Sequence, residues 1–318
     1  MVGDLARVSD ELVRSARSDD PYLTEIATHL IAAGGKLIRP GFCIAAAATA
    51  LDLDGPAGPD VIRGAAAVEL VHLGSLYHDD VMDDATTRHF VDSVNSRWGN
   101  HKAILAGDFL LARASEIAAS LGVEVAALLA ATIARLCEGQ VLELQHVHDP
   151  SRSEADYLRS ITGKTASLLA TACRIGGIVA RLSPVQLEAV TTFGHSYGMA
   201  FQIVDDVLDL VSTDAALGKP SGHDMEEGVY TLPVIRALAG ARGDELRALL
   251  TPSMSEAQRD AAVLIVRDGG HVDGAIDVAR TYAQTAASVL DDLPPGPGVD
   301  GFTAAAQHLV SSVEAAAT

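Results

Sequence analysis

The chain has 318 residues, 48% of them hydrophobic and only 4% aromatic, which is ample for a core built from alanine, leucine and valine. Its formal net charge of −19 argues against nucleic acid and against an anionic membrane surface as partners. The three cysteines are widely separated and show no C-x-x-C spacing, which predicts core thiols in a reducing compartment. Since no apolar leader and no stretch of roughly 18 uncharged apolar residues is present, we expect a cytoplasmic protein without a membrane span.

Helical periodicity dominates the chain and strand alternation is nearly absent, which predicts an all-α fold. The breaks between helices are short, including the proline-rich segment 294–297, and composition does not shift along the chain. We therefore predict a single domain over residues 1–318. The expected helices cover residues 4–16, 20–33, 38–51, 59–84, 93–99, 101–120, 123–147, 153–178, 183–211, 229–239, 243–250, 255–268, 270–290 and 302–316.

A glycine pair and two cations stand at the opening of the third expected helix. Gly34 and Gly35 end the preceding helix, and Lys36 and Arg39 follow at once. Glycines allow close approach of the backbone, and the amide groups at a helix start favour anions. A glycine-lysine turn is common, however, so this segment indicates an anion site only together with other features.

The first acidic cluster, Asp79-Asp80-Val81-Met82-Asp83, lies at the end of the expected helix 59–84. Residues four apart lie on one face of a helix, so Asp79 and Asp83 form a carboxylate pincer. Holding like charges that close is costly unless a cation lies between them. A solvated helix face is the simpler interpretation of one such cluster. Arg88 follows within reach of a ligand held there.

The same D-D-x-x-D pattern recurs at Asp205, Asp206 and Asp209, inside another apolar helix. Two identical clusters make a merely solvated face improbable. Oxygen-only ligands favour a hard divalent ion, most plausibly magnesium, which accepts substrate phosphates as further ligands. Lys219 stands in the Gly/Pro-rich loop that follows, where it could close on a phosphate. The sequence predicts a metal-diphosphate enzyme.

Lys164 and Thr165 interrupt the apolar helix expected at 153–178. A lysine in such a place most often extends to solvent along its aliphatic stem, so alone it is weak evidence for a site.

A di-iron carboxylate bundle is the alternative metal site. It uses two Glu-x-x-His pairs and two lone glutamates from other helices. It would leave both aspartate clusters and the glycine-lysine segment without a role. The candidates are Glu69 with His72, Glu143 with His146, and the lone Glu116 and Glu188.

Taken in order, these segments resemble the trans-isoprenyl diphosphate synthases, also called polyprenyl synthetases, across nearly the whole chain. The resemblance implies an all-α, isoprenoid synthase-type bundle of about 12–14 helices around a central cavity. Class I terpene cyclases share the first acidic motif, but their second mixes Asn, Ser and Glu, so a second aspartate cluster favours chain elongation. The matching segments are Gly34-Gly35-Lys36-x-x-Arg39-Pro40, Glu69-x-x-His72, His78-Asp79-Asp80-x-x-Asp83, Leu105-Ala106-Gly107-Asp108, Glu138-Gly139-Gln140, Gly163-Lys164-Thr165, Phe201-Gln202-x-x-Asp205-Asp206-x-x-Asp209, Gly218-Lys219-Pro220, and Asp224 with Thr231-Leu232-Pro233.

The resemblance implies a magnesium-dependent, head-to-tail condensation of isopentenyl diphosphate with an allylic diphosphate to give an all-trans polyprenyl diphosphate. It also implies a homodimer and about three Mg²⁺ ions bridging the allylic diphosphate. The implied metal ligands are Asp79, Asp80, Asp83, Asp205, Asp206 and Asp209. Arg88, Lys164 and Lys219 would hold the allylic diphosphate, with Thr165 and Gln202 beside the reacting carbon. Lys36, Arg39, His72 and His89 would bind isopentenyl diphosphate.

His89 departs from the family pattern, which has a second arginine after Arg88. A histidine is largely neutral near pH 7 and lacks the bidentate fork of arginine. Three interpretations follow: a weakened isopentenyl site rescued by another cation such as Arg97, an altered acceptor, or a degenerate synthase. A non-catalytic prenyltransferase subunit and a class I cyclase or irregular coupling enzyme also stay open. We favour a working prenyltransferase because every metal-binding aspartate survives.

Product length depends on the floor of the cavity, which in this family is formed by the residues four and five before the first aspartate. Here these are Ser75 and Gly74, both small, and Ser115 on a later helix is small too. The first motif also lacks the two-residue insertion of many bacterial short-chain synthases. We therefore expect products of four or more isoprene units, C20 or longer.

Overall fold

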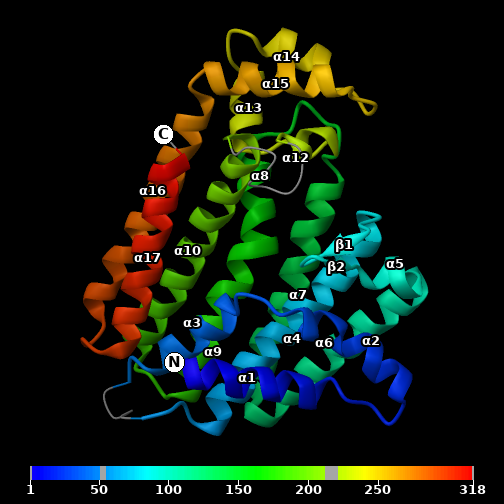
Figure 1. Cartoon of the computed structure of the whole chain (residues 1–318). Helices are drawn as coiled ribbons and strands as arrows, with labels where there is room; N and C mark the ends of the chain where they lie inside the picture. Colours follow the sequence, from blue (N-terminus) through cyan, green and yellow to red (C-terminus); the bar gives the residue numbers. More distant parts are fainter. Residues whose placement is uncertain (1, 51–54, 212–220, 317–318) are drawn as a thin grey trace. The chain divides into compact units, whose positions relative to one another are not determined.

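The computed structural model describes residues 2–50, 55–211 and 221–316. Within these ranges the chain is helical apart from one two-stranded hairpin (Figure 1), which confirms the prediction of an all-α fold. The chain forms two compact units: residues 1–133, 168–194 and 290–302 make the first, and residues 134–167, 195–289 and 303–318 make the second.

The first unit is built around α4 (Pro59–Met82), which packs against α1, α3 and α6. A Cβ added at Gly74 would lie 3.0 Å from the carbonyl oxygen of Gly107, so these glycines bring α4 and α6 close together. Tyr77 is fully buried and donates its hydroxyl to the carbonyl oxygen of Ile26, 2.9 Å away, which fixes α4 against α2. The other elements are α1 (Val2–Ser15), α2 (Pro21–Ala33), α3 (Ile38–Ala47), β1 (Thr87–Arg88), β2 (Val91–Asp92), α5 (Val94–Trp98), α6 (Asn100–Leu121), most of α9 (Ser167–Val179), and the first parts of α7 (Val123–Leu144) and α10 (Pro184–Val211).

The second unit contains the rest of α7 and α10 and a set of shorter helices. Its α13 packs against α8, α14, α15 and α16. Arg236 on α13 joins these helices, since it ion-pairs with Glu154 at 2.7 Å and donates to the carbonyl oxygen of Gly274. These helices are α8 (Glu154–Ile161), α12 (His223–Glu226), α13 (Leu232–Leu238), α14 (Gly243–Leu249), α15 (Glu256–Asp268) and α16 (His271–Ser288); the 3₁₀ turn Val289–Asp292 and α17 (Pro297–Ala316) follow in the chain.

Several helix ends follow the expected chemistry. The side chain of Ser153 accepts a hydrogen bond from the amide of Asp156 and so caps the N-terminus of α8. Ser255 and Gln258 form a reciprocal capping box at α15. The last helix starts earlier than expected, at Pro297 rather than residue 302, because proline is well suited to a first helical turn.

A π-helical turn, Thr162–Ala166, separates α8 from α9 where one continuous helix was expected. Two glycines accompany it. A Cβ at Gly163 would lie 2.8 Å from the Cα of Gly139 and 2.7 Å from the carbonyl oxygen of Arg135, so neither glycine leaves room for a side chain. The wider turn therefore lies where α7 approaches most closely, and it carries Lys164 and Thr165.

The β1–β2 hairpin was not predicted. Arg88 pairs with Val91, and the two residues between them, His89 and Phe90, both have left-handed backbones with φ of 50° and 64°. Such two-residue turns usually contain asparagine or glycine, so a His-Phe pair gave no turn signal. Phe90 is fully exposed.

Phe90→Gly should raise the free energy of unfolding by roughly 0.5–1 kcal/mol, because glycine adopts φ > 0 without the steric cost and Phe90 has no packing to lose. Chemical denaturation would measure the change. Phe90→Ala is the matched control, since it removes the ring without relieving the backbone, and should leave stability nearly unchanged. Equal stabilisation by both variants would contradict the argument.

Candidate active site

The first acidic cluster lies at the C-terminal end of α4. Asp80 is fully buried (0% exposed), while Asp79 is half-buried and Asp83 is exposed just beyond the last turn. Asp80 turns inward, accepts a hydrogen bond from Arg88 Nε at 2.8 Å and ion-pairs with Arg88 Nη2 at 2.6 Å. Burial raises the pKa of Asp80, and the Arg88 guanidinium opposes that rise. The cluster therefore has a buried member that fixes Arg88 and two members nearer the surface.

The donor set of this cluster suits a hard cation. The Oδ2 atom of Asp80 is buried and has no hydrogen-bond partner among the described residues. An unsatisfied buried carboxylate oxygen is costly, and a cation with oxygen-rich coordination would satisfy it. Within residues 2–50, 55–211 and 221–316, no three His, Cys, Asp or Glu side chains are already gathered as a metal site. The aspartates thus fit a divalent ion that takes further oxygen ligands from elsewhere, such as a phosphate.

The predicted isopentenyl residues come together in the first unit. Burial and the charges of Arg39, His89 and Arg88 hold the pKa of His72 well below its usual range, so His72 is a neutral imidazole near pH 7. A Cβ on Gly35 would lie 4.0 Å from the His89 ring, so His89 lies over the glycine turn. Lys36 is exposed beside that turn.

Arg39 and Glu69 form a buried charged pair next to His72. Burial lowers the pKa of Arg39 and raises that of Glu69, and each charge opposes the shift of the other. Arg39 Nε and Glu69 Oε2 are both buried without a hydrogen-bond partner in the described part of the chain. These unsatisfied groups mark a polar pocket, consistent with the predicted anion site. Arg97, the predicted rescuing cation, instead ion-pairs with Glu25 at 3.5 Å and stacks on Trp98 at 4.4 Å.

His89→Arg should lower the KM for isopentenyl diphosphate about five- to tenfold, because a permanent, forked cation would replace an imidazole ring beside His72. The allylic KM should change less than twofold. Steady-state kinetics with each substrate varied would measure both. His101→Arg, an exposed histidine on α6, is the charge control. An unchanged or higher isopentenyl KM in His89→Arg would contradict this assignment.

The second acidic cluster belongs to a hydrogen-bonded array in the second unit. The hydroxyl of Thr165 donates to Gln202 Oε1 at 2.8 Å, and Gln202 Nε2 donates to Asp206 Oδ1 at 2.9 Å. Tyr157, which is fully buried, donates its hydroxyl to Asp206 Oδ2 at 2.5 Å. Burial and the neighbouring Asp224 raise the pKa of Asp206 well above its usual range, while these two donors oppose the rise. Hydrogen bonds therefore connect the three predicted residues Thr165, Gln202 and Asp206.

Lys164 ion-pairs with Glu143 on α7, next to this array. The same Glu143 is a candidate iron ligand in the di-iron alternative, but in the structure it pairs with Lys164. His146, the other half of that pair, lies 2.8 Å from the carbonyl oxygen of Leu142 and 3.8 Å from Asp156. The geometry favours the diphosphate interpretation over the di-iron site.

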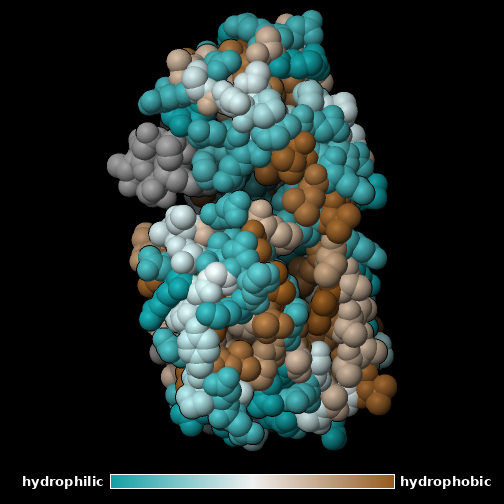
Figure 2. All heavy atoms as spheres, turned by 90° about the vertical axis from the view of Figure 1, so that its right-hand side faces the viewer, coloured by the Kyte–Doolittle hydropathy of each residue, from teal (hydrophilic) through white to brown (hydrophobic). Residues whose placement is uncertain are grey.

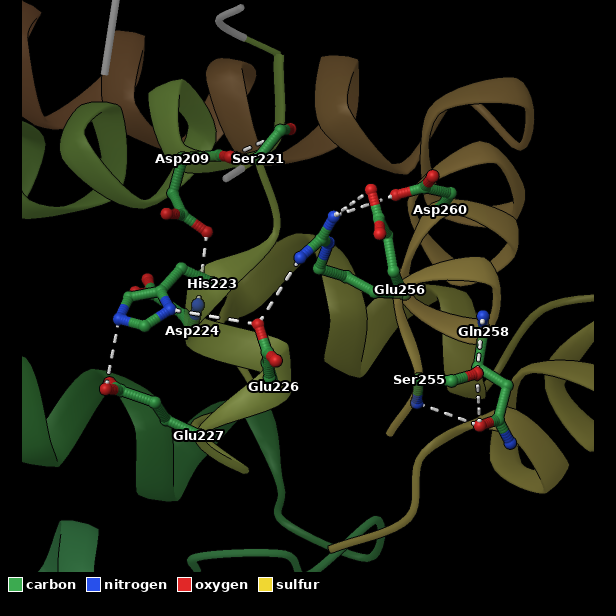
Figure 3. A network of polar contacts seen from close by, with 11 residues as sticks. Asp209, Ser221, His223, Asp224, Glu226, Glu227, Ser255, Glu256, Gln258 and Asp260 are labelled. Atoms are coloured by element: carbon green, nitrogen blue, oxygen red, sulfur yellow. Dashed lines mark hydrogen bonds and ion pairs between the residues drawn. The ribbon is translucent and has the colours of Figure 1, made fainter. Parts of the chain in front are cut away.

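The end of α10 is tied to the segment that begins at Ser221. The Oδ2 of Asp209 accepts a hydrogen bond from the amide of Asp224 at 3.3 Å, and Ser221 donates to the carbonyl oxygen of Asp209 (Figure 3). Figure 3 also shows His223 between Glu226 and Glu227, with its Nε2 3.0 Å from Glu227. Asp205 is exposed on α10. Lys219, predicted to bind the diphosphate, lies outside the described residues.

Four residues of this region had no predicted role in diphosphate chemistry. Asp224 stood in a matching segment without an assigned function, and Glu143 was considered only for iron. Tyr157 and Arg152 gave no sequence signal, because their importance depends on tertiary contacts with Asp206 and its neighbours.

The residues proposed to set product length lie on α4 and α6. Gly74 faces α6, where a Cβ would meet Gly107 and Leu111. Ser75 is half-buried and donates to the carbonyl oxygen of His72 at 2.8 Å, and Ser115 is exposed and donates to that of Leu111. Ser75 is therefore the position where bulk can be added without a clash between helix backbones.

One described helix, α7, is long and apolar enough to cross a membrane by length and composition, with 22% of its most hydrophobic window buried. Arg135 and Glu138 interrupt it. A single such helix is weak evidence, because a helix that packs in a protein passes the same test. Its exposed hydrophobic residues include Val123, Val141 and Leu144, and Figure 2 shows hydrophobic side chains gathered in a band on the face that it draws.

Comparison with known proteins adds a family. The family model described as polyprenyl synthetase matches residues 20–265. A nonaprenyl diphosphate synthase of Mycobacterium tuberculosis is 38% identical over 96% of this chain and 92% of its own length. A decaprenyl diphosphate synthase structure from Rhodobacter capsulatus superposes with a TM-score of 0.90 at 33% identity, covering 98% of this chain and 97% of that one. A polyprenyl synthase from Caulobacter crescentus, solved with calcium and isoprenyl diphosphate, gives a TM-score of 0.89 at 35% identity over 97% of this chain and 94% of that one.

Proposed function

This chain belongs to the polyprenyl synthetase family, and we propose that it joins isopentenyl diphosphate to an allylic diphosphate in a magnesium-dependent reaction to make an all-trans product of C20 or longer. It is a prenyltransferase, a trans-polyprenyl diphosphate synthase. The observation that carries the finer proposal is the array of Thr165, Gln202 and Asp206, with the Lys164–Glu143 pair beside it. A cation, an oriented hydroxyl and a carboxylate lie together there, which supports the proposal.

The proposed magnesium ligands are the aspartates of the two acidic clusters. They are Asp79, Asp80 and Asp83 in the first unit, and Asp205, Asp206 and Asp209 in the second. When bound, Mg²⁺ would supply Lewis-acid neutralisation of the charge that develops on the departing diphosphate. Calcium with isoprenyl diphosphate in the Caulobacter crescentus structure supports a divalent cation. The unsatisfied Oδ2 of Asp80 supports the same role in this chain.

Arg88 and Lys164 are the described cations proposed to bind the allylic diphosphate. Arg88 is held in place by Asp80, so its guanidinium is oriented before substrate arrives. Lys164 lies on the π-helical turn and carries a point charge with three donors. Lys219 is proposed for the same role from the sequence pattern alone.

Thr165 and Gln202 are proposed to stabilise the allylic cation once its carbon–oxygen bond breaks. Their oxygen dipoles are fixed by hydrogen bonds, so they need no reorganisation during the reaction. The isopentenyl double bond then attacks the cation, and no enzyme nucleophile is required. By family analogy the released diphosphate accepts the final proton.

Arg39, His72 and His89 are proposed to bind the diphosphate of isopentenyl diphosphate, with Lys36 at the glycine turn. The neutral state of His72 lets it donate one N–H without competing with Arg39 for a counter-ion. Glu69 supports Arg39 from the buried side. We propose a homodimer, which the exposed apolar residues of α7 support. We also propose a cytoplasmic location, as expected from the sequence.

Incubation with Mg²⁺, labelled isopentenyl diphosphate and geranyl, farnesyl or geranylgeranyl diphosphate would test the function. We expect elongation to C20 or longer, lost when EDTA is added and restored by Mg²⁺. Light scattering of the purified protein would test the dimer. No elongation with any primer would leave only a non-catalytic subunit or a cyclase, and release of a cyclic hydrocarbon would identify the latter.

Ser75→Phe should shorten the main product by at least one isoprene unit, because it adds bulk one helical turn before Asp79 where the growing chain would extend. Chromatography of the dephosphorylated products would measure the shift. Ser75→Ala removes only the hydroxyl and should leave the product unchanged. The same product length from both variants would remove Ser75 from the cavity floor.

A further inference from the structure

A buried arginine beside the Lys164–Glu143 pair has unused donors. Arg152 is only 5% exposed, and its Nη1 donates to the carbonyl oxygen of Tyr230 at 3.1 Å. Its Nε and Nη2 are buried without a hydrogen-bond partner among the described residues. Unsatisfied donors on a buried cation are costly, and they persist where another state of the protein uses them.

The charges around Arg152 identify the acceptor it lacks. Burial lowers the pKa of Arg152, and the nearby Glu143 is the strongest of the groups that raise it, ahead of Tyr157, Asp206 and Asp156. The guanidinium carbon lies 5.5 Å from the centre of the Tyr157 ring. Asp206 already accepts hydrogen bonds from Tyr157 and from a glutamine, and Asp156 is bonded to residues of its own helix. Of these carboxylates, Glu143 is therefore the one that could take Arg152 as a second ion-pair partner.

Glu143 needs another counter-ion when Lys164 leaves. In the present structure Lys164 is its hydrogen-bonding partner, and the Glu143 side chain is 18% exposed. If Lys164 turns to a bound diphosphate, Glu143 becomes a mostly buried carboxylate without a counter-ion, next to an anionic ligand. Both effects oppose binding of that ligand.

We propose that Arg152 is a positioning residue that takes over Glu143 as counter-ion when Lys164 moves to the allylic diphosphate. The inference rests on the proposed role of Lys164. The exchange keeps the number of ion pairs constant: the Lys164–Glu143 pair is replaced by an Arg152–Glu143 pair and a Lys164–diphosphate pair. Nε and Nη2 of Arg152 have no other acceptor among the described residues, so they are available for this pair.

A double-mutant cycle with Arg152→Met and Glu143→Gln tests the exchange. The readout is the Kd of farnesyl diphosphate with Mg²⁺ and without isopentenyl diphosphate, measured by calorimetry. Arg152→Met should weaken binding about tenfold, because Glu143 then retains Lys164. In the Glu143→Gln background the same change should weaken it less than twofold. Arg152→Lys, which keeps the charge but not the fork, should give an intermediate Kd.

Arg159→Met is the matched control, since Arg159 is an exposed arginine on α8 that ion-pairs with Asp156. It should leave the Kd unchanged. The KM for isopentenyl diphosphate should change less than twofold in every variant. If Arg152 had only a structural role, Arg152→Met would change this KM and the unfolding temperature as well as the Kd for farnesyl diphosphate.

Two results would overturn the proposal. One is an equal loss of farnesyl diphosphate binding from Arg152→Met with and without Glu143→Gln. The other is no loss from Arg152→Met at all. If the wild type bound farnesyl diphosphate but did not elongate it, only the proposed function would be wrong. If the wild type elongated it but the effects of Arg152→Met and Glu143→Gln on the Kd were additive, only the proposed exchange would be wrong. If the wild type did not bind farnesyl diphosphate, both the proposed function and the proposed exchange would be wrong.

Discussion

Asp80→Asn should lower kcat by about 10³-fold, an activation barrier higher by roughly 4 kcal/mol. Asp80 does two things that an amide cannot: it fixes Arg88 through an ion pair with a charged hydrogen bond, and it presents a buried, negatively charged oxygen suited to a cation. Asparagine keeps the size of the side chain, so the core of α4 should stay intact. Steady-state kinetics at saturating Mg²⁺ would measure the loss.

Asp84→Asn is the control for that variant. Asp84 is exposed, follows the cluster directly and has a left-handed backbone with φ of 48°, which asparagine tolerates well. Its kcat should stay within twofold of the wild type. If Asp80→Asn retained more than a tenth of the wild-type kcat with an unchanged Mg²⁺ requirement, Asp80 would be neither a metal ligand nor an anchor for Arg88.

Lys164→Met should lower kcat/KM for the allylic diphosphate by about 10²–10³-fold, because it removes a cation that we propose stabilises the charge accumulating on the leaving group. Methionine preserves most of the aliphatic stem, so the packing of the π-helical turn should survive. The KM for isopentenyl diphosphate should be nearly unchanged. Kinetics with the allylic substrate varied would measure the effect.

Lys102→Met serves as the control, since Lys102 is an exposed lysine on α6 that lies over the ring of Tyr22. It removes the same charge from a chain that has few cations, so it separates local binding from general electrostatic attraction. A loss from Lys102→Met as large as that from Lys164→Met would attribute the effect to net charge.

The sequence predicted the parts of the site that depend on local spacing. Asp79 and Asp83, or Asp205 and Asp209, are four apart on a helix, and this alone specifies a shared face. The long amphipathic helices were likewise predictable from their apolar period. Lys164 and Thr165 were noticed because they interrupt such a period.

What the sequence could not predict depends on contacts between distant segments. The π-helical turn arises where Gly139 and Gly163 let two helices touch, and neither glycine alone signals it. The hairpin turn has no glycine or asparagine to mark it. Arg152 appeared to be an ordinary loop residue, and only tertiary structure shows that it is buried.

The hydrogen bonds that run from Tyr157 to Thr165 have a direction. Both oxygens of Asp206 accept, so Gln202 must present its amide nitrogen to Asp206 and its carbonyl oxygen to Thr165. The hydroxyl hydrogen of Thr165 is therefore committed to Gln202, and only oxygen lone pairs remain on its other side. A threonine in this state can stabilise a neighbouring positive centre but cannot donate to an anion. The polarity of the array, set as far away as Tyr157, is thus consistent with the proposed carbocation at this position.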